Sequence, residues 1–203
     1  MLAERTDPFS NPKEHEAAVI FADLVAFTTW SERHTPAETI ALLRDVHGLL
    51  AEVVFRHQGT LDKFIGDGLM ATFGTPEPSG TDATRAVAAM VDMADTFQQW
   101  KAGSADGTSL NLAVGAHYGP VVIGNIGSRD RLEFAVLGDT VNVASRLESA
   151  TREIGCRCLA SAALVAAAET EDPETPIDIQ ARLTRQGPIR VRGRTEAIDV
   201  YRL

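Results

Sequence analysis

Two aspartates in this sequence lie beside β-prone apolar segments and could hold a divalent cation. Asp23 lies near the end of the apolar run Ala17–Leu24 (AAVIFADL), which reads as a strand buried on both faces and is an unusual place for a charge. Asp67 lies in the Gly66-Asp67-Gly68 segment between two short β-prone runs, a pattern typical of a hairpin turn. Carboxylate oxygens are ligands that Mg²⁺ prefers. Each aspartate also has a purely structural interpretation, as a turn cap or as the usual residue of a tight turn.

A helix-forming segment carries a second pair of polar residues. In Gly138–Glu148 (GDTVNVASRLE), Asn142 and Arg146 are four residues apart and therefore share one helix face. An Asn can orient a sugar or a base, and an Arg can neutralise charge that develops on a phosphoryl group. The alternative interpretation is that both are solvated residues of an ordinary helix.

The region between these groups supplies a phosphate-binding turn and a lysine. The segment 25–29 (VAFTT) leads from the first strand into a helix N-terminus, whose backbone N–H groups can hold phosphate. Lys63 lies on the strand that enters the Asp67 turn, where it is either a functional cation or a solvated edge lysine. Together, two carboxylates, this turn and an Asn/Arg pair indicate two-metal phosphoryl-transfer chemistry.

Other chemistries lack their motifs. The Gly124–Gly127 (GNIG) and Gly115–Gly119 segments do not form a dinucleotide-binding G-x-G-x-x-G, and the five histidines show no zinc-hydrolase spacing. Cys156 and Cys158 are too few for a disulfide framework, so we interpret them as small strand residues, with a redox pair or metal clip as the alternative.

The elements that must position these residues can be read from capping signals and periodicity. Thr35-Pro36-Ala37-Glu38 is a capping box that opens a helix extending to Gly59. Its expected apolar face consists of Ile40, Leu43, Val46, Leu50, Val53 and Val54. A second helix presents Val87, Met90, Val91, Ala94 and Phe97 on one face.

The second half of the chain alternates between strands and helices. Strands are expected at Leu110–Tyr118 and Val121–Ile126, joined across Gly119-Pro120, and at Leu132–Leu137. A helix follows at about 140–151, then a strand at Cys156–Ala160, a small helix near Ser161–Ala168 and terminal strands. This order predicts an α+β fold whose helices cover one face of a sheet.

Length and charge limit the domain count and the partners. With 203 residues and 44% hydrophobic content, the chain is expected to form a polar leader (1–16) and a single domain (17–203). The net charge of −9 disfavours nucleic acid as a partner. We find neither an apolar run long enough to span a membrane nor a secretory signal, and therefore expect a cytoplasmic protein with no direct membrane insertion.

Four segments together resemble the catalytic domain of class III nucleotidyl cyclases. Among these enzymes, the segments resemble the bacterial adenylyl cyclases. They are FADLVAFT, KFIGDGLMATFG, GNIGSRDRLEFAVLGDTVNVASRLE and IRVRGRTEAIDVYRL, and the similarity extends from about Val19 to Leu203. The resemblance implies a ferredoxin-like α+β core, an antiparallel sheet with helices packed on it. It also implies a head-to-tail homodimer with two interfacial active sites that convert a nucleoside triphosphate into its 3′,5′-cyclic monophosphate and pyrophosphate.

The resemblance also implies roles for individual residues around the metals. Asp23, Asp67 and the Leu24 carbonyl would bind two Mg²⁺ or Mn²⁺ ions, one activating the ribose 3′-hydroxyl and the other clamping the triphosphate. The backbone amides of Phe27 and Thr28 would contact phosphate.

Three further residues would complete the site. From the other protomer, Asn142 would orient the ribose and Arg146 would stabilise the pentavalent α-phosphate. Arg192 matches the basic residue that meets the terminal phosphates.

Two positions bear on the choice of base. Lys63 matches the lysine of adenylyl cyclases and favours ATP, because a donor suits adenine N1. Ala135 stands where adenylyl cyclases commonly have Asp or Thr, and an alanine cannot accept a hydrogen bond from the adenine amino group. The alternatives are a cyclase that uses GTP or pyrimidine triphosphates, and a non-catalytic nucleotide-binding dimerisation module.

Two more alanines depart from the family pattern. Ala26 stands where the phosphate turn often has glycine, and an alanine is tolerated there if its φ is negative. Ala113 stands where some relatives carry a phosphate-binding arginine, so that Arg192 and the turn amides would hold more of the triphosphate.

Overall fold

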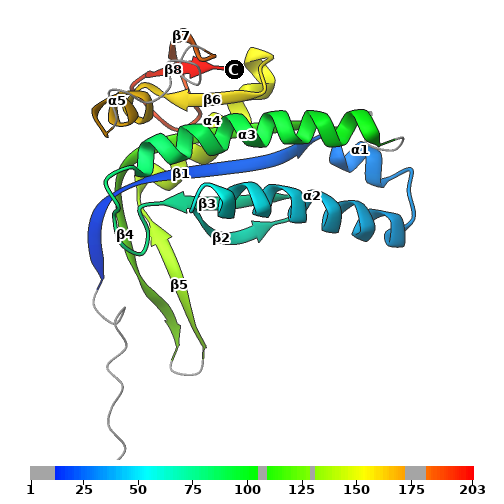
Figure 1. Cartoon of the computed structure of the whole chain (residues 1–203), viewed down its shortest axis with the longest axis horizontal. Helices are drawn as coiled ribbons and strands as arrows, with labels where there is room; N and C mark the ends of the chain where they lie inside the picture. Colours follow the sequence, from blue (N-terminus) through cyan, green and yellow to red (C-terminus); the bar gives the residue numbers. More distant parts are fainter. Residues whose placement is uncertain (1–11, 105–108, 129–130, 172–181) are drawn as a thin grey trace, which may run out of the picture.

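A ferredoxin-like arrangement forms the centre of the fold. The computed structural model describes residues 12–104, 109–128, 131–171 and 182–203. Its first strands and long helices follow the order β1 (Lys13–Val25), α2 (Pro36–Arg56), β2 (Thr60–Ile65), β3 (Gly68–Phe73), α3 (Asp82–Gly103) and β4 (Asn111–Ser128). The strands lie in the order β2-β3-β1-β4, all antiparallel to their neighbours (Figure 1). The expected α+β class with an antiparallel core sheet is therefore confirmed.

The strand that carries Asp23 is buried on both faces, as its apolar run predicts. Ala18, Ile20 and the following even-numbered residues of β1 join a core beneath α2 and α3. Ala17 and Val19 point to the other face, where they share a second core with Ala144 of α4 (Asp139–Ile154). The expectation that the helices cover one face was wrong, because the apolar side of α4 packs on the opposite face (Figure 1). The strand begins at Lys13, four residues before the expected start at Ala17, and residues 1–11 lie outside the described part of the chain.

The capping box of α2 forms as the sequence predicts. The Thr35 side chain accepts a hydrogen bond from the Glu38 backbone N–H, and the Glu38 carboxylate accepts one from the Thr35 backbone N–H at 2.7 Å. Most of the expected apolar face is buried, but Ile40 is exposed and Leu42 is buried in its place. The helical periodicity of α3 is confirmed in full, since all five expected residues are buried.

A single long strand replaces the two that the Gly119-Pro120 pair suggested. Strand β4 runs through both residues, with Gly119 opposite Ala17 and Pro120 opposite Glu16 of β1. Its distal half pairs with β5 (Arg131–Leu137), and together they form an arm that extends away from the rest of the molecule (Figure 1). A two-stranded ribbon of this kind is marginally stable alone, so the arm is suited to packing against another surface.

The last quarter of the chain extends the sheet beyond β4. Strand β6 (Cys158–Ser161) pairs parallel to β4, and α5 (Ala162–Glu171), β7 (Thr184–Ile189) and β8 (Ile198–Arg202) follow. Cys158 is buried in β6, whereas Cys156 precedes the strand, and both thiols are free. None of the helices in the described ranges is long and apolar enough to cross a membrane.

A glycine sets how closely α4 approaches the sheet, and its replacement should be costly. A Cβ at Gly115 of β4 would lie 2.0 Å from the Glu148 backbone nitrogen and 2.4 Å from the Ala144 carbonyl oxygen. We expect Gly115→Ala to lower the free energy of unfolding by more than about 2 kcal/mol, because α4 must move off the sheet. Gly48→Ala is the matched control, since a Cβ in this exposed helical position would meet no atom within 4 Å apart from its chain neighbours and the helix's own backbone. It should raise the stability by about 0.5–1 kcal/mol. Urea denaturation of both variants measures the difference, and equal effects would contradict the account.

Candidate active site

The two sequence-predicted metal-binding aspartates come together in the structure. Gly66 and Asp67 form the turn between β2 and β3, and Gly68, at the start of β3, lies against Asp23 near the end of β1. A Cβ on Gly68 would be 2.8 Å from Asp23 Oδ1, so this glycine allows the two segments to meet. Burial raises the pKa of Asp23 above its ordinary value, and the charge of Asp67 raises it further. The two carboxylates are therefore close enough to repel each other.

An arginine that the sequence analysis did not identify partly neutralises this pair. Arg152 of α4 donates a hydrogen bond from Nη2 to Asp23 Oδ2 at 2.7 Å, and its Nη1 lies 2.8 Å from Glu148 Oε1. Arg152 lowers the pKa of Asp23, but less than burial and Asp67 raise it. The Glu148–Arg152 spacing of four residues was readable from the sequence. The contact with Asp23 was not, because it joins residues 129 positions apart.

A histidine on α2 lies beside the turn that carries Asp67. The His47 ring stacks on Phe64 of β2, with centroids 4.2 Å apart. Burial lowers the pKa of His47, and the Asp67 backbone raises that pKa by less. This residue too was absent from the sequence-based site, since nothing in the local pattern connects α2 with the turn.

The carboxylate oxygens of Asp23 and Asp67 are suitable ligands for a divalent cation that also binds substrate phosphates. Mg²⁺ is usually held by one or two carboxylates plus phosphate oxygens rather than by a full protein cage. Asp23 and Asp67 supply two mutually repelling carboxylates. The described ranges contain no group of three or more His, Cys, Asp or Glu residues that could hold a metal ion, so a cation at this pair would need further oxygen ligands such as phosphate or water. The backbone carbonyl of Leu24, next to Asp23, remains a prediction as a further ligand.

The turn that follows β1 is built around a strained alanine. Helix α1 (Phe27–Ser31) starts after Ala26, so the N–H groups of Phe27 and Thr28 belong to its first turn, where a helix offers them no carbonyl partner. Ala26 has φ of 70°, in the left-handed region. The condition under which an alanine would be tolerated here, a negative φ, is therefore not met: the turn keeps a glycine-like backbone although its residue is alanine.

Ala26→Gly should relieve this strain. Ala26 is exposed, so its methyl group contributes little packing, and we expect the substitution to raise the free energy of unfolding by about 0.5–1 kcal/mol. Ala166→Gly, in an exposed position of α5, is the control and should lower the stability by about 0.5–1 kcal/mol. Thermal unfolding of both variants distinguishes the two signs, and a destabilising Ala26→Gly would show that the turn carries no strain.

The two arginines that the sequence predicted line one cavity, which is separate from the Asp23–Asp67 pair. Arg146 of α4 and Arg192, in the segment between β7 and β8, both line a cavity of about 510 Å³, together with Arg190. A Cβ at Gly193 would lie 3.4 Å from Arg146 Nη2, so that segment packs directly beside the guanidinium. An ion pair between Arg194 and Asp139, the first residue of α4, fastens the same segment to the helix. Three arginines and one acidic residue, Glu153, line this cavity, so its lining has a net positive charge that suits phosphate groups.

Helix geometry separates these arginines from the aspartates within one chain. Arg146 and Arg152 are six residues apart, which places them about 9 Å apart along α4 and about 120° apart around its axis. Arg152 points to Asp23, and neither Asp23 nor Asp67 is among the described residues that line the Arg146 cavity. Asn142, one turn before Arg146, is exposed. The sequence-predicted site residues thus form two separate groups in this chain, one at Asp23 and Asp67 and one around Arg146.

The base-selecting candidates lie on different strands. Lys63 follows a bulge in β2 and is exposed, with its Nζ 3.2 Å from Asp62 Oδ2. Ala135 lies opposite Gly124 in the β4–β5 arm. Ala113 pairs directly with Asp23 across β1 and β4, so a longer side chain at this position would enter the carboxylate site.

Comparisons with known proteins identify the family. The model of the adenylate and guanylate cyclase catalytic domain matches residues 9–203. The chain belongs to this family. Adenylate cyclase 1 of Rhizobium meliloti (strain 1021) is 32% identical over 188 residues, and the adenylate cyclase of Anabaena cylindrica is 31% identical over 187 residues. These matches cover 92% and 90% of this cyclase domain but only 27% and 36% of the relatives' own lengths.

Solved structures place the domain in the same fold. The adenylyl cyclase CyaB from P. aeruginosa has a TM-score of 0.78 at 27% identity, over 95% of each chain. The guanylyl cyclase Cya2 has a TM-score of 0.77 at 28% identity, over 94% of this chain and 92% of that one. The resemblance noted in the sequence and its α+β fold are confirmed, whereas cyclases for both purine bases are similar to this domain.

Proposed function

We propose that this domain is an adenylyl cyclase, which converts ATP to 3′,5′-cyclic AMP and pyrophosphate at two sites shared between the protomers of a homodimer. The observation that carries the proposal is the division of the site described above. Asp23 and Asp67 form one half, Asn142, Arg146 and Arg192 form the other, and α4 directs the two halves apart.

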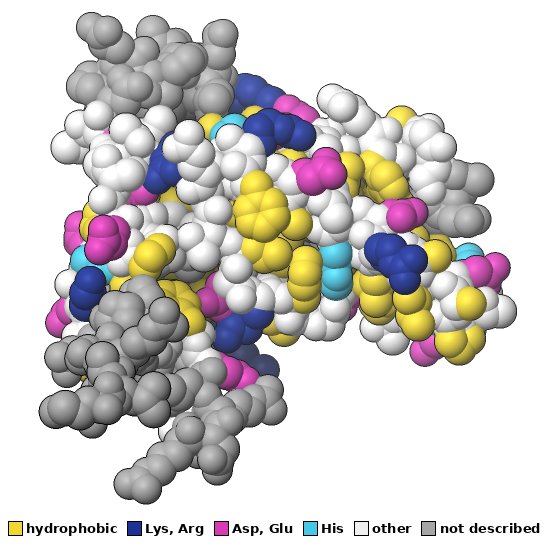
Figure 2. Space-filling model, turned by 60° about the horizontal axis from the view of Figure 1, so that its bottom comes forward, with side chains coloured by type: hydrophobic (Ala, Val, Ile, Leu, Met, Phe, Trp, Pro, Cys, Tyr) yellow, Lys and Arg dark blue, Asp and Glu magenta, His cyan; other side chains and the backbone are white. Residues whose placement is uncertain are grey.

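Exposed apolar side chains support an assembly of two chains. Phe64 and Ile65, between Lys63 and Asp67, are 46% and 47% exposed. Others lie on α2 and on the β4–β5 arm: Ile40, Phe55, Val122, Ile126 and Leu137. Figure 2, which brings the lower side of Figure 1 forward, shows hydrophobic side chains gathered in the middle of this face. Exposed apolar surface of this kind marks interaction sites, and a twofold interface would bring each half-site to its complement.

In such a dimer the residues would act as follows. Asp23 and Asp67 would hold two Mg²⁺ or Mn²⁺ ions, which supply Lewis-acid stabilisation of the attacking 3′-oxygen and of the triphosphate. The N–H groups of Phe27 and Thr28 would bind phosphate oxygens next to the aspartates. Asn142 of the partner chain would orient the ribose so that the 3′-oxygen lies in line with the α-phosphorus.

The arginines would act on the developing charge. Arg146 would stabilise the pentavalent α-phosphate, where negative charge increases as the bond to pyrophosphate breaks. Arg192 would hold the terminal phosphates, and Arg190, in the same cavity, adds to the positive field.

Lys63 supports ATP as the substrate, because its ammonium can donate to adenine N1 but cannot accept from the guanine N1–H. We expect Lys63→Ala to lower the ratio of kcat/KM for ATP to kcat/KM for GTP by about 10-fold or more. Lys13→Ala is the control, since Lys13 is a half-exposed lysine at the start of β1. Measuring both ratios with purified protein tests the assignment, and an unchanged ratio in Lys63→Ala would contradict it.

Ala135 favours a second candidate, a cyclase with a relaxed base preference. The adenine amino group would find no acceptor in the Ala135 side chain, and an unpaired buried amino group costs about 1–3 kcal/mol. The same kcat/KM ratio decides between the candidates, because a relaxed enzyme turns over ATP and GTP at similar rates.

A further inference from the structure

A second cavity lies beside the carboxylate site and is lined by arginines. It has a volume of about 550 Å³. Its lining comes from the end of β1, the start of β4, the end of α4 and the residues before β6, the start of β7 and the end of β8. Arg152, Arg157, Arg182 and Arg202 line it, and none of its lining residues in the described ranges is Asp or Glu. This composition is unusual for a chain with 28 acidic and 19 basic residues. The cavity is distinct from the one that contains Arg146 and Arg192.

Two of the four arginines already have carboxylate partners. Arg182 binds Asp95 of α3 through two hydrogen bonds of 2.5 and 2.8 Å, and Arg152 binds Asp23 and Glu148. Arg157 and Arg202 make no ion pair with any carboxylate in the described part of the chain. In the described ranges these two guanidinium groups therefore have no direct carboxylate partner, although the charge of Arg157 also acts on Asp95.

The remaining walls suit a phosphate ester. Asn111 accepts a hydrogen bond from Lys101 Nζ at 2.8 Å through its Oδ1, which leaves its amide N–H groups free to donate. Thr184 adds a hydroxyl group, and Val25 and Leu112 add apolar surface. Guanidinium groups match phosphate oxygens in pairs, and the volume is within the range of small-molecule sites.

We propose that this cavity binds a small soluble molecule bearing a phosphate group, with Arg157 and Arg202 as its principal ligands. The binding does not depend on cyclisation, because none of the residues assigned to the chemistry lines the cavity.

The site is linked to the catalytic carboxylates through Arg152. This arginine lines the cavity and also pairs with Asp23, so a bound anion competes with Asp23 for the same guanidinium. By linkage, any change that frees Arg152 from Asp23 strengthens anion binding, and anion binding in turn releases Asp23.

Cys156 provides a reporter for the cavity. It is one of the lining residues and is partly exposed, whereas Cys158 is buried and its pKa is raised to about 12 by burial. A neutral alkylating reagent such as iodoacetamide should therefore label Cys156 selectively, which peptide mass mapping verifies.

The experiment measures the alkylation rate of Cys156 with and without inorganic phosphate, with chloride added to equal ionic strength. We expect about 10 mM phosphate to slow alkylation by about threefold or more and to do so saturably. The protection should disappear in Arg157→Gln/Arg202→Gln, and in Arg202→Gln alone if the double variant does not fold. It should persist in Arg192→Gln, which alters the other cavity.

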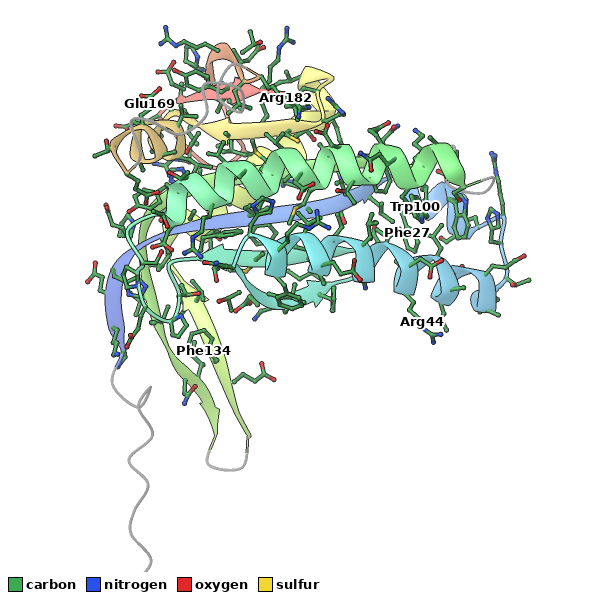
Figure 3. All side chains as sticks on the ribbon, viewed as in Figure 1. Phe27, Arg44, Trp100, Phe134, Glu169 and Arg182 are labelled. Carbon is green, nitrogen blue, oxygen red and sulfur yellow. The ribbon has the colours of Figure 1, made fainter. Side chains whose placement is uncertain are left out.

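Arg44→Gln is the matched charge control. Arg44 is exposed on α2, and Figure 3 shows it on the opposite side of the molecule from Arg182. This variant should keep full protection. Equal protection in wild type and the double variant, or no protection in wild type, would overturn the proposal. So would protection by vesicles containing phosphatidic acid when free phosphate and glycerol phosphate have no effect.

The link to Asp23 has its own test in the same assay. In Asp23→Asn, Arg152 loses the charge of its Asp23 partner. The phosphate concentration for half-maximal protection should therefore fall by at least about threefold. An unchanged concentration would show that the cavity and the carboxylate site are independent.

Discussion

Asp23→Ala is expected to lower kcat/KM for cyclic nucleotide formation by at least about 10³-fold, because one of the two carboxylates that hold the catalytic cations is lost. The fold should be retained, because Arg152 keeps Glu148 as its ion-pair partner. We therefore expect the free energy of unfolding to change by less than about 1 kcal/mol.

The matched control for this prediction is Asp45→Ala, an exposed aspartate of α2. It should leave both activity and stability nearly unchanged. Initial rates with saturating Mn²⁺ and urea denaturation of both variants provide the comparison. If Asp23→Ala retained more than a tenth of the wild-type activity, the assignment of the carboxylate pair to the cations would be wrong.

Arg146→Ala should reduce kcat by about 10²- to 10⁴-fold, because the charge that develops on the α-phosphate loses its principal guanidinium partner. The loss should appear mainly in kcat rather than KM, since the interaction strengthens in the transition state. Arg44→Ala, an exposed arginine on α2, is the control for removal of a positive charge.

Mixing the two inactive variants tests whether the site is shared. In a heterodimer of Asp23→Ala and Arg146→Ala chains, one site carries both substitutions and the other carries neither. If subunits exchange at random, half of the dimers are heterodimers with one intact site, so about a quarter of wild-type activity should return. A mixture that remains inactive after verified subunit exchange would contradict a shared site. It would then place each complete site within one chain.

Local signals in the sequence predicted much of the fold. The capping box at Thr35 and the apolar period of α3 report short-range geometry, and both appear as expected. The Asp67 turn likewise follows from the glycines around it. What failed depends on tertiary contacts: Gly119-Pro120 does not interrupt β4, because pairing with β1 continues across it. The expectation that helices cover one face of the sheet failed because α4 packs on the second face. The missing side chain at Gly115 allows α4 to lie close to β4.

In the candidate site, too, residues with local sequence signals were predicted, whereas residues that act through long-range contacts were not. Asp23, Asp67 and Arg146 were readable because their residue types and spacing indicate phosphoryl chemistry, and the family motifs reinforced them. Arg152 and His47 were not readable, since each acts on an aspartate far away in the sequence. The positive φ of Ala26 was not predicted either, because an alanine normally avoids the left-handed region. The turn from β1 into α1 imposes this backbone conformation.

The most direct test of the central claim is product analysis after the purified chain has been incubated with Mn²⁺ and, in separate reactions, ATP, GTP, CTP and UTP. We expect cyclic AMP to form from ATP at the highest rate, with pyrophosphate as the second product. Formation of no cyclic nucleotide from any triphosphate, by protein shown to be folded and dimeric, would contradict it.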